Sequence, residues 1–126
     1  MNTLMWVIQI VLALAFFAHG LLLLFPPAVM VEQMNATLPR WFQLFLGVAE
    51  ALAAIGLTLP GLTRIKPWLV PWAAVGIMIV MISATVFHAF RGEISGAVTT
   101  FVLLLLATAV AYWRWRVAPI GSRTPA

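Results

Sequence analysis

The sequence predicts an all-α integral membrane protein, a bundle of four transmembrane helices. Of its 126 residues, 64% are hydrophobic and only 8% are charged, and the mean hydropathy is +1.10. A soluble domain carries about 25% charged residues, so this chain lacks the polar surface that water requires. Four apolar runs fill most of its length. Each is long enough to cross a membrane, since one crossing needs roughly 20 residues. We therefore expect one transmembrane domain, 1–116, and a disordered cytoplasmic tail, 117–126.

The first predicted span covers residues 4–25 and ends at a Pro-Pro pair, which stops a helix. It is interpreted as a retained helix and not as a signal peptide, because no basic residue precedes it and further spans follow. Gln9 and His19 are connected through Leu12 and Phe16 by steps of three, four and three residues. The two polar side chains therefore share one helix face. Residues 28–40 then form an interfacial connection that is long enough for a short surface helix.

The second predicted span covers residues 41–59 and contains Glu50, a carboxylate inside an apolar run. A charge at the bilayer centre costs about 3 kcal/mol or more unless it is paired, solvated or neutralised. The polar and small residues of this span recur at steps of three and four, which predicts one stripe that faces the bundle. They are Gln43, Gly47, Glu50, Ala54 and Thr58.

The third predicted span covers residues 68–90, with Pro71 in its first turn, where a missing N–H costs little. A tight turn follows, because Gly92 is a natural helix terminator. The fourth span covers residues 94–112. A Trp-Arg-Trp-Arg sequence comes directly after it and indicates the membrane interface.

The basic residues predict the orientation of the bundle. The N-terminus, the loop between the second and third spans and the tail lie on one side of the membrane and hold five of the seven basic residues. Lys and Arg are enriched in cytoplasmic loops. We therefore expect a multi-pass protein of the bacterial inner (plasma) membrane with both termini in the cytoplasm.

The composition also excludes several classes of function. The net charge is +4, but the basic residues make no continuous surface for nucleic acid. The chain contains no cysteine, which excludes disulfides, thiolate metal sites and CxxC redox chemistry. If the protein takes part in redox chemistry, a quinone, another bound cofactor or a protein partner must carry the electrons.

A polar group is expected in the outer half of the bundle, whereas the half nearest the termini is expected to be comparatively dry, with Gln9 and Thr58 as its main polar exceptions. Glu50 and His19 are the candidate catalytic residues, because a carboxyl group and an imidazole can exchange a proton. The candidate ligand-binding residues around them are Arg40, Gln43, His88, Arg91 and Thr100.

Other interpretations of these residues stay open at this point. Glu50 could be protonated, or hydrogen-bonded to Gln43, Thr100 or a histidine, and only set the register of the helices. Each histidine could be an ordinary bundle or interface residue, and Arg40 could be a snorkelling anchor. No metal site is expected, because neither HxxxH nor ExxH spacing occurs.

Several short motifs follow one another in a fixed order: Gly47-x-x-Glu50, Gly56-Leu57-x-Leu59, a basic loop through Arg64, a proline-led third span ending in Ala84-x-x-x-His88, and the Arg91-Gly92-Glu93 turn. This order resembles the DoxX-like family of small four-span membrane proteins. The resemblance implies association with oxidoreductase systems, as in the membrane subunits of thiosulfate:quinone oxidoreductase. Many relatives have a lysine after the glycine near the end of the first span, whereas Gly20 here is followed by leucines.

The preferred interpretation is a quinone- or lipid-interacting accessory subunit of a membrane oxidoreductase system, with an outward-facing pocket around Glu50. Its ligand would be a quinone or another amphipathic small molecule, and no covalently bound cofactor is expected. One alternative is a non-catalytic assembly or scaffold protein whose small-residue seams bind a protein partner or a second copy in a homo-oligomer. A second alternative is a small proton or weak-acid transporter, which predicts an inverted repeat. The sequence leaves open whether the protein is an enzyme.

Overall fold

The computed structural model describes residues 2–117 and 119–121. It contains α1 (Asn2–Leu24), α2 (Ala28–Thr37), α3 (Arg40–Thr63), α4 (Leu69–Phe90) and α5 (Ile94–Tyr112), which continues into a π-helical segment, η1 (Trp113–Val117). Four helices of this described part, α1, α3, α4 and the continuous α5–η1, are long and apolar enough to cross a membrane. The predicted all-α bundle of four transmembrane helices is therefore confirmed.

α2 forms the connection between the first two spanning helices. It is a short helix of ten residues, and none of them is buried. A helix without a buried face gains little from packing on the bundle, which agrees with the surface helix expected at the membrane interface.

The end of α3 differs from the prediction. The helix continues from the predicted end at residue 59 to Thr63, with Pro60 inside it. The last turn is held by tertiary packing, since a Cβ placed on Gly61 would lie 2.7 Å from the ring of Trp6 and 2.9 Å from Ile120. Arg64 ends the helix in a left-handed conformation with a φ of 58°.

The predicted tail, 117–126, lies partly outside the described residues. Residues 119–121 are described, and they return to the end of α3, where the Arg64 Nε atom donates a 2.8 Å hydrogen bond to the carbonyl oxygen of Gly121. This first part of the tail therefore contacts the bundle.

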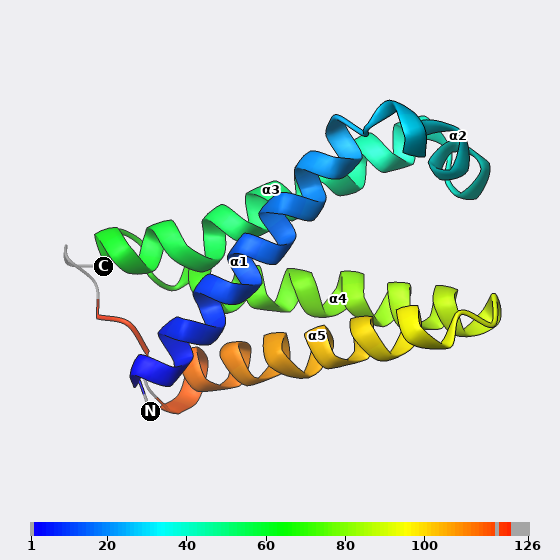
Figure 1. Cartoon of the computed structure of the whole chain (residues 1–126). Coiled ribbons are helices and arrows are strands. Elements are labelled where there is room, and N and C mark those ends of the chain that lie inside the picture. The colour runs from blue at the N-terminus through cyan, green and yellow to red at the C-terminus, as the bar shows by residue number, and fades with distance from the viewer. Residues whose placement is uncertain (1, 118, 122–126) are drawn as a thin grey trace.

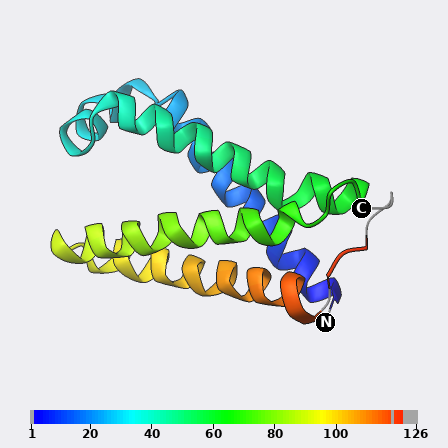
Figure 2. The ribbon, with the colours of Figure 1, turned by 180° about the vertical axis from the view of Figure 1, so that it is seen from behind.

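The spanning helices form two hairpins that diverge from one end to the other. α1 packs along α3, and α4 packs along α5 (Figure 1). The two pairs lie closest near the chain termini and separate toward α2 and the α4–α5 turn, as the view from behind also shows (Figure 2). The first and last described residues lie at the same end, as an even number of spans requires.

The buried core occupies the half of the bundle nearest the termini. On α1, Leu12 is fully buried, whereas the side chain of His19, seven residues further along the same face, is 56% exposed. On α4, Ile77 is buried and His88 is only partly covered. The buried residues of α4 end at Met81 because the hairpins separate, whereas α1 keeps Gly20 and Leu23 buried against its own hairpin partner. Polar side chains in the far half are therefore covered mainly by their own hairpin.

Within the first hairpin, two glycines bring the backbones of α1 and α3 into contact. A Cβ placed on Gly20 would lie 2.9 Å from the carbonyl oxygen of Gly47, and one on Gly47 would lie 2.8 Å from Cγ of Leu24. The predicted stripe on α3 is buried except at Thr58, which is half-buried, while its neighbour Leu57 is fully buried. Gly47 and Glu50 of this stripe contact α1. Small residues thus allow the close helix approach that is typical of membrane seams.

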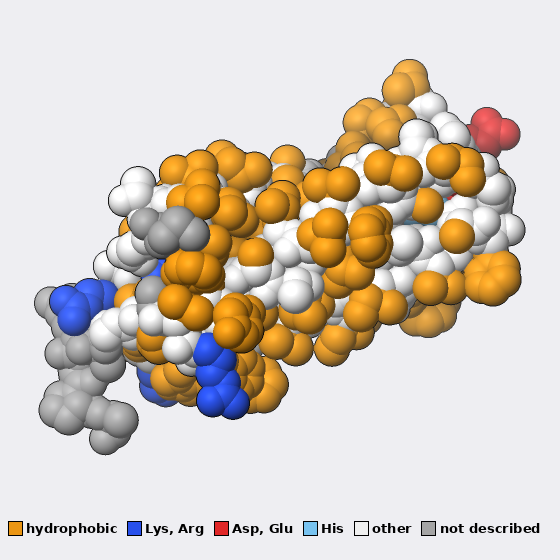
Figure 3. All heavy atoms as spheres, turned by 90° about the horizontal axis from the view of Figure 1, so that it is seen from below, with side chains coloured by type: hydrophobic (Ala, Val, Ile, Leu, Met, Phe, Trp, Pro, Cys, Tyr) orange, Lys and Arg blue, Asp and Glu red, His pale blue; other side chains and the backbone are white. Residues whose placement is uncertain are grey.

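The charged side chains are distributed unevenly along the bundle. In Figure 3, Lys and Arg side chains lie at the end near the termini, and an acidic side chain lies at the opposite end. The orientation of the bundle in the membrane stays a prediction.

Candidate functional site: the His19–Glu50 pair

His19 on α1 and Glu50 on α3 form a side-chain pair within the first hairpin. The His19 Nδ1 atom lies 3.0 Å from Oε1 and 3.1 Å from Oε2 of Glu50. The Glu50 side chain is 5% exposed, whereas that of His19 is 56% exposed. The carboxyl group is therefore buried behind an imidazole that forms part of the surface of the hairpin.

The glycine contact between the two helices positions this pair. His19 directly precedes Gly20, and Glu50 lies one turn after Gly47. A Cβ placed on Gly20 would lie 3.5 Å from the Cβ of Glu50. Because the two backbones touch here, the short side chain of Glu50 reaches the imidazole without leaving the seam.

The hydrogen bond between the pair determines which atoms can react. The Nδ1 atom and the carboxyl group share a proton, so Nε2 is the ring nitrogen that can act on another molecule. Within the described part of the chain, Nε2 has no hydrogen-bond partner. The pair can therefore donate or accept one hydrogen bond, or exchange one proton, at an exposed edge in the far half of the bundle.

Arg40 lies at the start of α3 and binds the end of α1. Its Nη1 and Nη2 atoms donate hydrogen bonds of 2.7 and 2.8 Å to the carbonyl oxygens of Leu23 and Leu24. These carbonyls have no partner within α1, since they belong to its last turn. Arg40 therefore closes the C-terminal end of α1 beside the pair.

Gln43 connects Arg40 to the loop before α3. The side chain is 1% exposed, and its Nε2 atom donates to the carbonyl oxygen of Leu38 at 2.8 Å and to Asn35 at 3.0 Å. Its Oε1 atom accepts a 3.2 Å hydrogen bond from Arg40. The amide group is thus fully used within the protein, and the assignment of Arg40 and Gln43 to a ligand stays a prediction.

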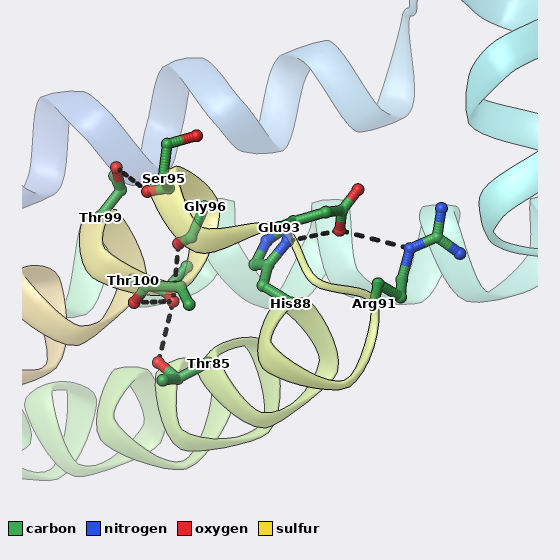
Figure 4. Close-up of polar contacts among 9 residues, drawn as sticks. Thr85, His88, Arg91, Glu93, Ser95, Gly96, Thr99 and Thr100 are labelled. Carbon is green, nitrogen blue, oxygen red and sulfur yellow. Dashed lines mark hydrogen bonds and ion pairs between the residues drawn. The ribbon is translucent and has the colours of Figure 1, made fainter.

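The remaining predicted residues lie on the second hairpin (Figure 4). The Nδ1 atom of His88 lies 2.9 Å from Oε1 of Glu93, which also accepts a 3.3 Å hydrogen bond from Nε of Arg91. The hydrogen bond with His88, and then the nearby charge of Arg91, hold the pKa of the Glu93 carboxyl below its usual value. These three residues form a cluster at the α4–α5 turn.

Thr100 belongs to this second hairpin as well. Its hydroxyl lies 2.8 Å from the hydroxyl of Thr85, so it connects α5 to α4 (Figure 4). In the described residues, none of the hydrogen bonds of Thr100, His88 or Arg91 reaches the His19–Glu50 pair. The structure therefore separates the predicted residues. On the first hairpin, His19 pairs with Glu50 and Arg40 pairs with Gln43, whereas His88, Arg91 and Thr100 lie on the second hairpin.

The half near the termini holds the polar Gln9 as expected, but the expectation that it is otherwise comparatively dry is wrong at Arg114. Arg114 of η1 is 3% exposed, and its Nε atom donates a 2.6 Å hydrogen bond to Oε1 of Gln9. Its Nη1 atom binds Asn2, and its guanidinium lies 5.2 Å from the ring centroid of Trp6. The Nε2 atom of Gln9 in turn donates to the carbonyl oxygen of Leu57 at 2.8 Å. Gln9 on an interior face was the signal, because a buried amide requires partners.

The fold and the pair define a small four-span membrane protein with a carboxyl–imidazole pair inside its first hairpin. The family described as the DoxX-like family matches residues 7–110, which include most of every spanning helix. The chain belongs to the DoxX-like family, as its motifs predicted. No curated protein and no solved structure matches the chain.

Proposed function

We propose that the protein binds the polar ring of a quinone at the His19–Glu50 pair, as an accessory subunit of a membrane oxidoreductase system. The observation that carries this proposal is the exposed imidazole of His19, held by a buried carboxyl group at 3.0 Å with its Nε2 atom unused. A ring carbonyl accepts a hydrogen bond from N–H at this position, and a ring hydroxyl donates to a neutral nitrogen.

The depth of His19 favours a ring over a phosphate. His19 lies six residues beyond Ala13, the middle of α1, or about 9 Å by helix rise. This position is roughly 6 Å inside the boundary of a hydrocarbon core about 30 Å thick. Phospholipid phosphates lie outside that boundary, whereas the ring of an amphipathic quinone can enter the core.

Each residue of the pair has a separate task in this proposal. His19 contacts the ring and passes a proton through its imidazole, while Glu50 orients the imidazole and holds the proton on the Nδ1 side. A bound quinone would supply the electron-carrying ring. Because the chain contains no cysteine, a protein partner and not a thiol pair of this chain supplies the electrons.

We further propose that the protein lies in the bacterial inner membrane with both termini in the cytoplasm. Its support is the position of the basic side chains at the end of the bundle near the termini (Figure 3). With this orientation, the pair lies in the outer half of the membrane and opens toward the periplasmic leaflet.

The test measures binding of a short-chain ubiquinone analogue to the protein in lipid nanodiscs by calorimetry. We expect His19→Gln to raise the Kd about tenfold, the loss of one hydrogen bond worth about 1.4 kcal/mol. Glu50→Gln should raise the Kd similarly, because the imidazole loses its orientation. The matched control is His88→Gln, since His88 also binds a carboxylate but lies on the other hairpin.

Two results would contradict the proposal. The first is a wild-type protein that does not bind the analogue, and the second is an unchanged Kd in His19→Gln. Circular dichroism checks folding of each variant. If Glu50→Gln unfolds while His19→Gln binds as the wild type does, Glu50 sets only the helix register.

A further inference from the structure

A shallow groove lies on the second hairpin, near the end of the bundle that holds the termini. It has a volume of about 360 Å³ and is open to the surroundings along most of its surface. Its lining comes from α4, α5 and η1, and includes Val75, Met78, Ala111, Tyr112, Trp115 and Arg116.

Arg116 brings a charge to this groove that the described residues do not neutralise. Within the described residues, Arg116 makes no hydrogen bond or ion pair. In this respect Arg116 differs from Arg64 and Arg91, whose guanidinium groups donate hydrogen bonds to protein oxygens. The neighbouring Arg114 is turned into the bundle, so Arg116 is the basic group of η1 that faces outward.

The acidic residues of the chain lie elsewhere. There are three, and they occur on α2 (Glu32), on α3 within the first hairpin (Glu50) and at the α4–α5 turn (Glu93). α2 and the α4–α5 turn are at the far end of the bundle (Figure 1). A counter-ion for Arg116 must therefore come from outside the described chain.

The rest of the groove suits a molecule that is polar at one end and apolar at the other. Trp72 and Trp115 pack together with ring centroids 4.9 Å apart, and Tyr112 is 61% exposed. Such aromatic residues are typical of the headgroup level of a membrane. Val75 and Met78 extend the lining along α4 into the span, where an acyl chain would lie.

The groove is long enough to hold both a polar headgroup and part of an acyl chain. Thr108 also lines it and precedes Arg116 by eight residues, or about 12 Å by helix rise. The groove therefore runs from the interface into the hydrocarbon layer, and its charged end lies where lipid phosphates are found. A free phosphate ion would use only the charged end.

We propose that this groove binds an anionic glycerophospholipid of the leaflet nearest the termini. The guanidinium of Arg116 holds the phosphate, Tyr112 and Trp115 contact the glycerol region, and one acyl chain lies along Val75 and Met78. Arginine suits this role because its planar group donates two hydrogen bonds to one phosphate. This site is independent of the proposed quinone site, which lies on the other hairpin.

The test is native mass spectrometry of the full-length protein, loaded with equal amounts of phosphatidylglycerol and phosphatidylethanolamine. We expect preferential retention of phosphatidylglycerol by the wild type, and a roughly fivefold loss of that preference in Arg116→Gln. The matched control is Lys66→Gln, which removes an exposed charge at the same end outside the groove. A second variant, Val75→Trp, keeps Arg116 and fills the apolar part, and should also reduce retention.

Several outcomes would overturn the inference. Equal losses in Arg116→Gln and Lys66→Gln would indicate a general effect of surface charge. Unchanged retention in Val75→Trp would show that no acyl chain lies in the groove. Displacement of the lipid by millimolar glycerol phosphate would indicate a site for a soluble phosphate. A wild type that retains both lipids equally would rule out selection of the anionic headgroup.

Discussion

Replacing Gly20 by alanine tests the close contact that holds the His19–Glu50 pair. The new Cβ would lie 2.9 Å from the carbonyl oxygen of Gly47 and 3.2 Å from the backbone nitrogen of Ala51. Both atoms belong to the backbone of α3, so neither can turn aside, and α1 and α3 must separate by roughly 0.5 Å to restore ordinary contacts. Overpacking of this kind costs about 1 to 3 kcal/mol.

Alanine also raises helix propensity, by about 1 kcal/mol relative to glycine. A matched control separates the two effects. Gly76 lies inside α4, and a Cβ there meets no atom within 4 Å, so Gly76→Ala has the gain in propensity without the clash. The difference between the two variants therefore reports the clash itself, and we expect Gly20→Ala to be less stable than Gly76→Ala by about 1 to 3 kcal/mol.

The assay is equilibrium unfolding in mixed micelles, with increasing SDS and detection by far-UV circular dichroism. Quinone binding is measured on the same samples, because separation of α1 from α3 also lengthens the 3.0 Å contact between His19 and Glu50. Equal stabilities of Gly20→Ala and Gly76→Ala would refute the argument, since they would show that the helices approach less closely than described.

Three further predictions concern the other polar clusters and the orientation. Gln9→Leu removes the acceptor of the buried Arg114 Nε atom and should lower the free energy of unfolding by about 2 kcal/mol in the same assay. Because the pKa of Glu93 is lowered in the folded protein, its contribution to stability is present above its ordinary pKa and is lost as the pH falls through the lowered value. The free energy of unfolding of the wild type should therefore exceed that of Glu93→Gln at pH 6, and this difference should shrink as the pH is lowered to 3. A reporter fused after the tail should show a cytoplasmic C-terminus.

Each of these predictions has a control or an opposing result. Thr99→Val removes an exposed hydroxyl that binds only its own helix, so a loss as large as that of Gln9→Leu would argue against a special role of the buried network. A constant difference between wild type and Glu93→Gln across that pH range would contradict the lowered pKa. A periplasmic reporter would reverse the orientation and place the pair in the inner half of the membrane.

Much of the candidate site could be predicted from the α3 stripe. A carboxylate in an apolar run needs a buried partner, so Glu50 was recognisable as the centre of a polar group. Its partner was harder to choose, because His19 and His88 both lie in the far half of the chain's spans. The structure selects His19, since α1 contacts α3 through Gly20 and Gly47, while His88 binds Glu93 within its own hairpin.

The burial of Arg114 could not be predicted from the local sequence. A Trp-Arg-Trp-Arg sequence after an apolar span is typical of an interface belt, and Arg116 and Trp115 are exposed in agreement with it. Arg114 is buried instead, because the N-terminal part of α1 brings Gln9 and Asn2 to it. This contact joins residues more than a hundred positions apart, which local pattern does not reveal.

The number of spans, their approximate bounds and the buried stripe of α3 were determined by the sequence alone. Bilayer thickness sets the length of an apolar run, and the helical period sets which side chains share a face. The tertiary structure decided which helix covers each face, where the two hairpins separate, and that α3 continues through Pro60 to Thr63. These features depend on contacts between distant segments, and a stripe on one helix does not specify the helix that packs against it.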